Sequence, residues 1–367
     1  MTDNVQIIAS SRSWIEQTAI DQLHRTANLE GIERAVGLPD LHAGRGIPIG
    51  AAFWSRTHAH PHLIGNDIGC GMALWQTDIK TAKFKLDQAV KKLTGLDEPW
   101  LGDQLCEFER VGLPKNLAGE ALGTIGGGNH FAEFQRVETV IDEQTFDKMG
   151  LNRSQLLLLV HSGSRGLGHA IQEDHTRRFN ADGLSTSSQA FTDYLAKHDQ
   201  AMVWAKLNRD IIATRFLSKL AAEAELKLDI FHNSLTRHQD GWLHRKGAAP
   251  ADKGPIVIPG SRGTMTYLVM PKREQADRAL HSLAHGAGRK WPRSSAKAKL
   301  GRKISVAELE RTSLGGRVLC EDNQLIFEEA PQAYKDIESV ISDLEQAGLI
   351  RVIAVLRPVI TYKTRRQ

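Results

Sequence analysis

The sequence predicts an α+β fold, because it contains segments typical of strands and segments typical of helices that do not alternate regularly. Three short apolar runs, each bounded by turn residues, are typical of buried strands. Two longer stretches without interior proline or glycine are typical of helices.

The predicted strands each lead into a loop that carries polar or glycine residues. The run LLLLV at 156–160 precedes the loop HSGSRGLGH, LDIF at 228–231 ends directly before His232, and GPIVI at 254–258 precedes Pro259. Because buried strands commonly place their following loops at one edge of a sheet, we expect these loops to meet.

The predicted helices lie later in the chain. Residues 191–225 are rich in helix formers and lack proline and glycine, so we expect a helix over this range. Residues 331–349 have Pro331 near the start and Gly348 near the end, which predicts a second helix. The apolar segment IRVIAVLRPVI at 350–360 then predicts a strand.

Composition favours a single cytoplasmic domain over residues 1–367. Hydrophobic residues make up 41% of the chain, and we find no repeat and no linker long enough to separate two domains. Three widely spaced cysteines and the absence of a signal-like N-terminus indicate a reducing compartment. No apolar run approaches the roughly 20 residues that cross a bilayer, so we expect no membrane association.

Basic residues are concentrated in one segment, although the net charge is only +4. Residues 289–303 contain seven lysines or arginines and no acidic residue. Such runs are most often solvated surface, but beside a catalytic cleft this one would suit a polyanion.

Glycine-rich segments at the predicted strand ends carry the residues with the most distinctive chemistry. Asp67 and Cys70 lie in GNDIGCG, where glycine lets the backbone approach a ligand closely. Histidines occur in or beside four further segments, at His130, His161, His232 and His285. A lone histidine at a strand end is more often structural, but four of them together with an Asp–Cys pair indicate a functional site.

These residue types are ligands of borderline divalent metals, and a thiolate can bridge two ions. A structural zinc site would usually show paired CxxC or HxxxH motifs, which this sequence lacks. One ligand from each loop therefore favours an open, catalytic metal site, with Asp67 and Cys70 at its centre.

Eight segments, in order along nearly the whole chain, resemble signature segments of the RtcB family of RNA ligases. They are DIGCGM, GGGNHFAE, HSGSRGLG, FHN, HRKGA, PGSRGT, HGAGR and EAPQAYKDI. The resemblance implies an RtcB-type fold, with mixed β-sheets surrounded by helices and a deep metal-containing cleft. It also implies joining of RNA 3'-phosphate or 2',3'-cyclic phosphate ends to 5'-hydroxyl ends, with GTP and two Mn(II) ions as cofactors.

The resemblance implies specific roles for the metal and catalytic residues. Cys70 would bridge the two manganese ions, with Asp67 and His130 completing one site and His161 and His232 the other. His285 matches the histidine that the family guanylylates. A neutral imidazole can attack the α-phosphate of GTP, and GMP would then pass to the RNA 3'-phosphate.

The resemblance also implies the residues that would contact the nucleotide and the RNA. Lys363 would contact the guanine, and Arg165 would face an RNA phosphate. Asp40, His42 and Arg289 would also lie near the RNA. The full set of expected nucleotide contacts is Asn129, His130, Phe131, Ala132, Glu133, His232, Asn233, Pro259, Gly260, Ser261, Arg262, Thr266, His285, Gly286, Ala287, Gly288 and Lys363.

The chain departs from the family pattern at several places that bear on substrate preference. Arg262 replaces a methionine after PGS, Thr266 replaces a serine, and RKWPRS with Trp291 and Pro292 replaces RxMSR. The chain is also short for the family and resembles its compact subgroup associated with a PrfH-like release factor. That resemblance implies repair of broken RNA in translation, such as rRNA, over tRNA splicing, and a functional link to such a factor.

Two other classes of protein could use some of these residues. A metal-dependent RNA phosphodiesterase or nuclease could use the same ligands with His285 as a general acid or base. A non-catalytic RNA-binding homologue is the second alternative, although it would have little reason to retain the ligands and the nucleophile together.

Overall fold

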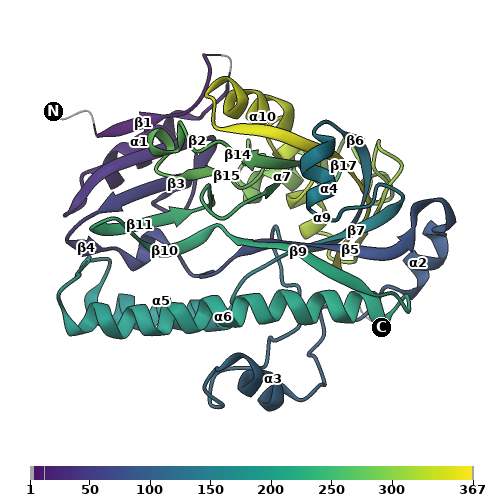
Figure 1. The fold of residues 1–367 in the computed structure, drawn as a ribbon, viewed down its shortest axis with the longest axis horizontal. Coiled ribbons are helices and arrows are strands. Elements are labelled where there is room, and N and C mark those ends of the chain that lie inside the picture. The colour runs from purple at the N-terminus through teal and green to yellow at the C-terminus, as the bar shows by residue number, and fades with distance from the viewer. Residues whose placement is uncertain (1–3, 12, 366–367) are drawn as a thin grey trace.

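The computed structural model describes residues 4–11 and 13–365, and it confirms the predicted α+β class. Two larger sheets lie side by side, and the long helix α6 (Gln189–Ser218) runs along one side of both, with α5 (Arg165–Phe179) against one end of it (Figure 1). The sheets hold the predicted strands, and the site residues lie near the ends of strands or in the segments that follow or precede them.

The larger sheet has eight strands and supplies most of the site. Its order is β13-β14-β17-β6-β7-β5-β9, and β16 also pairs with β17. The bounds are β5 Gly71–Lys80, β6 Phe131–Val140, β7 Gln155–Ser162, β9 Ala224–Phe231, β13 Ile256–Pro259, β14 Thr266–Pro271, β16 Arg317–Cys320 and β17 Ile350–Thr364.

The second sheet has five strands in the order β1-β2-β3-β11-β10, and two short ribbons, β12-β15 and β4-β8, accompany it. The bounds are β1 Val5–Ile7, β2 Ile32–Ala43, β3 Pro48–Ser55, β10 Asn233–His238 and β11 Gly241–Lys246, with β4 His58–Ala59, β8 Leu184–Ser185, β12 Ala248–Pro250 and β15 Ser282–Ala284 in the ribbons.

The remaining helices are short and lie around the sheets, except α3, which lies beyond α6 (Figure 1). The α-helices are α1 Gln17–Ala27, α2 Leu86–Lys92, α3 Gln104–Val111, α4 Glu143–Lys148, α7 Arg293–Leu300, α8 Val306–Leu309, α9 Leu325–Glu328 and α10 Ile337–Gln346. Single 3-10 turns occur at Pro61–Leu63, Thr81–Lys83, Ala276–Ala279 and Pro331–Ala333.

Strand β7 shows why LLLLV is apolar at every position. All five of its residues are fully buried, and they alternate between the two faces of the sheet. Leu157 and Leu159 pack in one core cluster, whereas Leu156, Leu158 and Val160 pack in another. The predicted strands around 228–231, 254–258 and 350–360 are likewise confirmed by β9, β13 and β17.

The predicted helix over 191–225 is correct up to Ser218 but wrong beyond it. Ala221 has a φ of 52°, and the Ala222 amide donates to the Leu217 carbonyl, which closes the helix end. Ala224 then pairs with Thr77 as the first residue of β9. Pairing with β5 therefore overrides the helix propensity of this segment.

The predicted helix over 331–349 is divided in two. Pro331–Ala333 forms a 3-10 turn, and α10 begins only after Asp336, whose carboxylate accepts a hydrogen bond from the Ser339 amide at 3.0 Å. Gly348, with a φ of 71°, lies just after the helix as expected.

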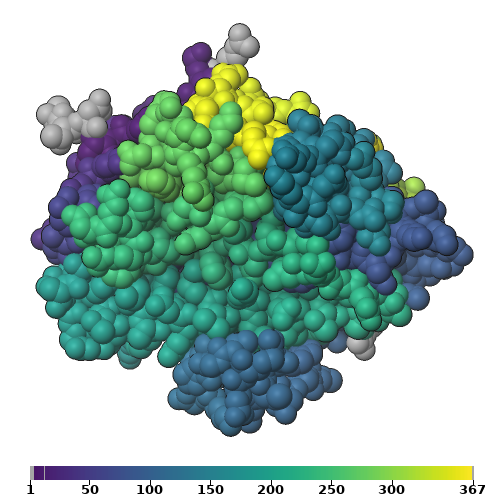
Figure 2. Space-filling view, viewed as in Figure 1, coloured from purple at the N-terminus to yellow at the C-terminus, as the bar shows by residue number. Residues whose placement is uncertain are grey.

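The main core cluster includes residues from both larger sheets, among them Val36 of β2, Ala52 of β3 and Leu268 of β14. This shared core supports our proposal that the chain forms one domain. The segment with α3 stands out from the rest beyond α6 (Figures 1 and 2). Among the described residues, no helix is long and apolar enough to span a membrane.

Candidate metal and nucleotide site

A cleft of about 1800 Å³ contains most of the residues that the sequence singles out. All five expected metal ligands line it, and so does His285. Of the expected nucleotide contacts, Ala132 and Thr266 do not line the cleft, and neither does Asp40 of the expected RNA contacts.

The order of strands in the larger sheet explains how the metal ligands meet. Cys70 comes just before β5, and His232 comes just after β9. Gly71 of β5 pairs with Ser162 of β7 on one side and with Phe231 of β9 on the other. Since these strands are antiparallel, the start of β5 lies at the same edge as the ends of β7 and β9.

The fourth strand at this edge is β6, which adds His130. Phe131 at its start pairs with His161, so His130 lies next to the end of β7. Neighbouring strands β6, β7, β5 and β9 therefore present His130, His161, Cys70 and His232 along one edge of the sheet.

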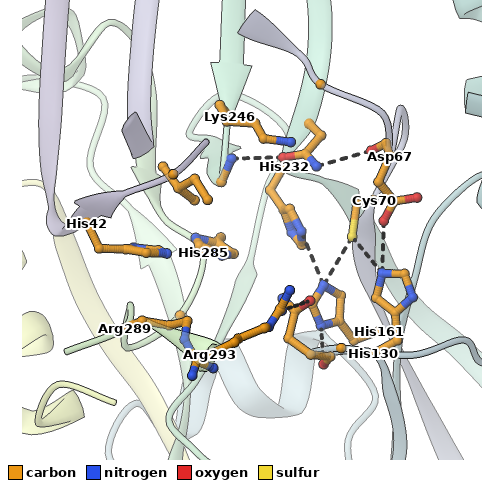
Figure 3. A pocket seen from close by; sticks show the side chains of 18 of the residues that line it. His42, Asp67, Cys70, His130, His161, His232, Lys246, His285, Arg289 and Arg293 are labelled. Carbon is orange, nitrogen blue, oxygen red and sulfur yellow. Dashed lines mark hydrogen bonds and ion pairs between the residues drawn. The ribbon is translucent and has the colours of Figure 1, made fainter. Parts of the chain in front are cut away.

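The side chains converge at short distances (Figure 3). Cys70 Sγ lies 3.2 Å from His161 Nε2 and 3.4 Å from His130 Nε2. The Nε2 atoms of His161 and His232 are 3.3 Å apart. Asp67 Oδ2 lies 2.8 Å from His130 Nε2. The Cys70, His130 and His161 donor atoms all lie within 4.8 Å of one another, as a metal ion would require.

Backbone carbonyls hold two of these rings in the orientation that a metal ligand needs. His130 Nδ1 lies 3.1 Å from the Ile125 carbonyl, and His161 Nδ1 lies 3.1 Å from the Asn129 carbonyl. A carbonyl only accepts, so each Nδ1 donates its proton. In the neutral His161 ring, the Nε2 lone pair therefore points at the cluster, as is usual for metal-bound histidine.

Asp67 has a free oxygen in the cluster. Its Oδ1 is buried without a hydrogen-bond partner, which is unusual for a carboxylate. Gly163 makes room for this carboxylate, because a Cβ at Gly163 would lie only 2.2 Å from Asp67 Oδ1. The glycine that follows β7 in the sequence HSG is thus explained by the close approach of Asp67.

Burial sets the protonation of the cluster. It raises the pKa of the Cys70 thiol well above its ordinary value, and the neighbouring Asp67 carboxylate adds to this. Burial also lowers the pKa of His161 and of His232, so both rings are neutral. Burial would raise the pKa of Asp67, but the adjacent His130 outweighs it and keeps that pKa well below its usual range.

These features fit a divalent cation. The site offers an unpartnered carboxylate oxygen, imidazole lone pairs and a thiol that would need a nearby positive charge to ionise. Together they are the ligand types of a borderline metal.

Arg209 of α6 supports the metal site, and sequence reasoning missed it. The fully buried guanidinium donates to the Gly69 carbonyl at 2.9 Å and to the Ser162 carbonyl at 2.8 Å, which fixes the residues beside Cys70 and His161. Its Nε lies 2.9 Å from Asp229 Oδ1. The available signal was an arginine on the same helix face as Ala205, Ile212 and Ala213, which lie one turn away.

Lys246 was also missed. It lines the cleft, and its Nζ donates to the Ile64 carbonyl at 2.9 Å. Burial lowers its pKa, and the acidic groups of Asp67 and Cys70 oppose this effect. Lys246 therefore brings positive charge to the edge of the metal cluster.

His285 lies on the side of His232 away from Cys70, and the two ring centres are 4.8 Å apart (Figure 3). Its Nδ1 is 2.7 Å from Asp40 Oδ2, so Nδ1–H donates a hydrogen bond to the carboxylate, and in this tautomer Nε2 has the lone pair. Asp40 has no exposed surface, so we reassign it from an RNA contact to a positioning residue for His285. His42 does line the cleft, and burial lowers its pKa to about 4.

A second group of side chains lies around Phe131 and Lys363. Lys363 Nζ lies 6.0 Å from the centre of the Phe131 ring and 3.9 Å from Glu329 Oε2. Burial raises the pKa of Glu133 to about 7 and lowers that of Lys363 to about 8. Glu329 is a further residue that sequence reasoning missed, although it begins the EAPQAY segment.

Ala132 and Thr266 require a correction. Ala132 is fully buried in the core cluster that lies on the face of β6 away from the cleft. The Thr266 hydroxyl accepts from Gln135 Nε2 at 2.9 Å, and the same amide donates to Glu133 Oε1 at 2.7 Å. Neither side chain can contact a nucleotide directly, and Thr266 acts instead through Gln135 on Glu133.

The two expected RNA-contacting arginines differ in their surroundings. Arg165 lines the cleft at the start of α5, and its Nε is buried without a partner. Arg289 also lines the cleft, but its guanidinium already binds the Glu329 carboxylate at 3.2 Å and the Glu328 carbonyl at 2.8 Å. Arg165 therefore has more free hydrogen-bonding capacity.

The chain is similar to known proteins over nearly its whole length. The family model described as tRNA-splicing ligase RtcB matches residues 22–97 and 112–364. The chain is 50% identical over 371 residues to a protein of Escherichia coli named RNA-splicing ligase RtcB2, covering 99% of this chain and 96% of that protein.

Two archaeal proteins, each named tRNA-splicing ligase RtcB, are more distant. The protein of Archaeoglobus fulgidus is 28% identical over 440 residues, covering 94% of this chain and 90% of that protein. That of Methanococcus maripaludis is 29% identical over 447 residues, covering 94% of this chain and 91% of that protein. Both alignments are longer than the 367 residues of this chain, so the archaeal proteins contain insertions. With a family match over most of its length and a half-identical relative, the chain belongs to the RtcB family.

Proposed function

We propose that this protein is an RNA ligase that uses GTP and two Mn(II) ions to join RNA 3'-phosphate or 2',3'-cyclic phosphate ends to 5'-hydroxyl ends. The observation that carries the proposal is the convergence of Asp67, Cys70 and three histidines beside His285, in a chain of the RtcB family. The relatives' names, which include RNA-splicing and tRNA-splicing ligase, support the RNA substrate.

Five residues would hold the metal ions. Cys70 would bridge the two ions, with Asp67 and His130 on one and His161 and His232 on the other. When bound, divalent ions neutralise charge that develops on phosphate oxygens. The unpartnered Asp67 Oδ1 and the Nε2 atoms that converge near Cys70 Sγ support this assignment.

His285 would be the nucleophile. Because Nδ1–H donates a hydrogen bond to Asp40, the lone pair lies on Nε2, which would attack the α-phosphate of GTP. An N–P bond forms and pyrophosphate leaves. The RNA 3'-phosphate then displaces His285 and takes GMP, and finally the 5'-hydroxyl attacks this activated phosphate, with GMP as the leaving group.

The rest of the cleft would hold the nucleotide and the RNA. The expected contacts that line the cleft are the Asn129–Phe131 segment, Glu133, His232, Asn233, the Pro259–Arg262 segment, the His285–Gly288 segment and Lys363. We propose Arg165 and His42 as RNA contacts, since both line the cleft. The partly paired Arg289 would contact RNA only at its remaining donors.

We further propose that the reaction repairs broken RNA in the cytoplasm, in functional association with a PrfH-like release factor. The compact chain and its similarity to the protein named RtcB2 support this choice. The three cysteines are all free, which is consistent with a reducing compartment.

A joining assay tests the proposal. Two labelled RNAs, one ending in a 3'-phosphate and one starting with a 5'-hydroxyl, are incubated with the protein, Mn(II) and GTP. We expect a product of the summed length only when GTP is present. Shortened RNAs without GTP would instead indicate a nuclease, and unchanged RNAs despite tight RNA binding would indicate a non-catalytic protein.

A further inference from the structure

Arg262 is a buried cation with unused hydrogen-bond donors in the wall of the cleft. It lines the cleft and is only 7% exposed. One nitrogen, Nη2, donates to the Ile326 carbonyl at 2.7 Å, whereas Nε and Nη1 are buried without a partner. A guanidinium keeps its charge and its five N–H groups even when it is buried, so a ligand is the natural source of the missing acceptors.

The donors that remain free include a matched pair. Nη2 has two N–H groups, one parallel to the Nε–H and the other parallel to an Nη1–H. The Ile326 carbonyl accepts one of these two. Whichever it accepts, the second Nη2–H and its parallel neighbour form a free two-donor edge, which suits a ligand with two adjacent acceptors.

The surroundings of Arg262 favour a base over a phosphate as that ligand. The charged or ionisable groups that act most strongly on Arg262 are Cys320, Glu329 and Tyr334. Glu329 and Glu133 both lie near Lys363, so two carboxyl groups line this end of the cleft. Lys363, Arg289 and Arg293 balance the charge of Glu329. Since the metal ligands are the better phosphate site, we expect the base at this end of the cleft.

Guanine matches the free two-donor edge of Arg262 better than adenine does. Guanine presents two adjacent acceptors, O6 and N7, on one edge, and arginine commonly binds this edge through two parallel hydrogen bonds. Adenine has an amino group in place of O6, so it would direct N–H against the guanidinium. The Phe131 ring, beside Lys363 in the same cleft, offers a face for a base to stack on.

We propose that Arg262 selects the nucleotide by donating two hydrogen bonds to O6 and N7 of guanine. The inference rests on the proposed function, because it assumes that GTP occupies this cleft. Arg262 replaces a methionine of the family pattern, and methionine cannot donate such bonds. This chain would therefore recognise the O6/N7 edge of the base through a contact that the methionine-containing pattern lacks.

Binding titrations that change one atom of the nucleotide and one residue of the protein test the proposal. GTP and 7-deaza-GTP, in which a C–H replaces N7, are titrated with Mn(II) into the full-length protein carrying His285→Ala, so that no adduct forms. The same titrations are repeated with the double variant that carries His285→Ala and Arg262→Met. We expect Arg262→Met to weaken GTP binding by between about 5-fold and about 150-fold, the range for one bidentate base contact. It should weaken 7-deaza-GTP binding much less.

The matched control is Arg293→Met, which removes a cleft arginine whose guanidinium lies against Glu329. Its ratio of GTP to 7-deaza-GTP affinity should equal that of the parent. Equal weakening of both nucleotides by Arg262→Met would overturn the proposal and indicate a phosphate contact. Arg262→Lys tests for misfolding, because it keeps the buried charge but not the paired edge, so it should fold and still lose the N7 preference.

Failure of the inference is distinguishable from failure of the proposed function. If the parent binds no guanine nucleotide, the proposed function is wrong. If the parent prefers GTP over 7-deaza-GTP and Arg262→Met retains that full preference, only the role of Arg262 is wrong.

Discussion

Cys70 contacts two histidines at the sheet edge, His161 at 3.2 Å and His130 at 3.4 Å from its Sγ, and is 3% exposed. The residue types and the glycine around Cys70 were enough to predict a metal site from the sequence. The sequence could not show that Asp40 holds His285, because the two residues are far apart in the chain and meet only through the fold.

Replacing Cys70 by Ala should abolish Mn(II) binding and GTP-dependent labelling together, because a bridging ligand serves both ions. Equilibrium dialysis with Mn(II) and intact-mass analysis after GTP measure the two effects. Cys106→Ala is the matched control, since this thiol is exposed and does not line the cleft, and it should change neither. Full labelling of Cys70→Ala would remove the bridging role.

Glu133 gives a pH-dependent prediction. Burial raises its pKa to about 7, from an ordinary value of 4.5. The folded protein therefore binds this proton more tightly, so Glu133 favours folding most below pH about 4.5 and loses this contribution as pH rises through about 7. The full effect on the free energy of unfolding is roughly 3 kcal/mol.

Urea unfolding of the metal-free protein at pH 5 and pH 8 checks this sign. Relative to the unmodified protein, Glu133→Gln should become more stable on going from pH 5 to pH 8, because the amide has no proton to lose. Glu120→Gln, at an exposed position, should show no such change. A constant difference between Glu133→Gln and the unmodified protein would contradict the raised pKa.

At the scale of elements, the sequence predicted strands better than helix ends. LLLLV could be assigned because a strand buried on both faces needs apolar residues at every position. The end of α6 could not, because residues 219–225 contain no proline or glycine, and the left-handed Ala221 and the pairing of β9 depend on the tertiary structure. Pro331 gave a wrong start for the next helix, because it begins a separate 3-10 turn and not α10.

The basic segment 289–303 is partly structural and partly exposed. Arg289 binds Glu329, whereas Lys297, Arg302 and Lys303 are exposed on or just after α7, whose first residues line the cleft. Replacing these three by Gln should weaken RNA binding and reduce the salt slope by roughly 0.7 to 0.9 per lost phosphate contact. GTP-dependent labelling should be retained, since none of the three lines the cleft.

Binding of a labelled single-stranded RNA over a series of salt concentrations measures the slope. The control replaces Lys83, Lys85 and Lys91 by Gln, which removes the same charge from exposed positions around α2. If both triple variants reduced the slope equally, the segment 289–303 would be ordinary solvated surface.

At the scale of the whole molecule, the site depends on contacts between segments that no local pattern reveals. Arg209 of α6 pairs with Asp229 of β9 and binds carbonyls on either side of the metal cluster. Arg262 and Glu329 come from separate segments, yet both line the same cleft as His285. Motifs could therefore predict the ligands and the nucleophile, but not the charges that surround them.

The central claim is that His285 carries GMP during the reaction, and mass analysis after incubation with GTP and Mn(II) tests it most directly. We expect the unmodified protein to gain the mass of one GMP, located on His285 by peptide mapping. His285→Ala should gain nothing, yet still bind Mn(II) and still seal RNA supplied as the 3'-guanylylated intermediate. GMP on another residue, or ligation of ordinary ends by His285→Ala at the unmodified rate, would contradict the account.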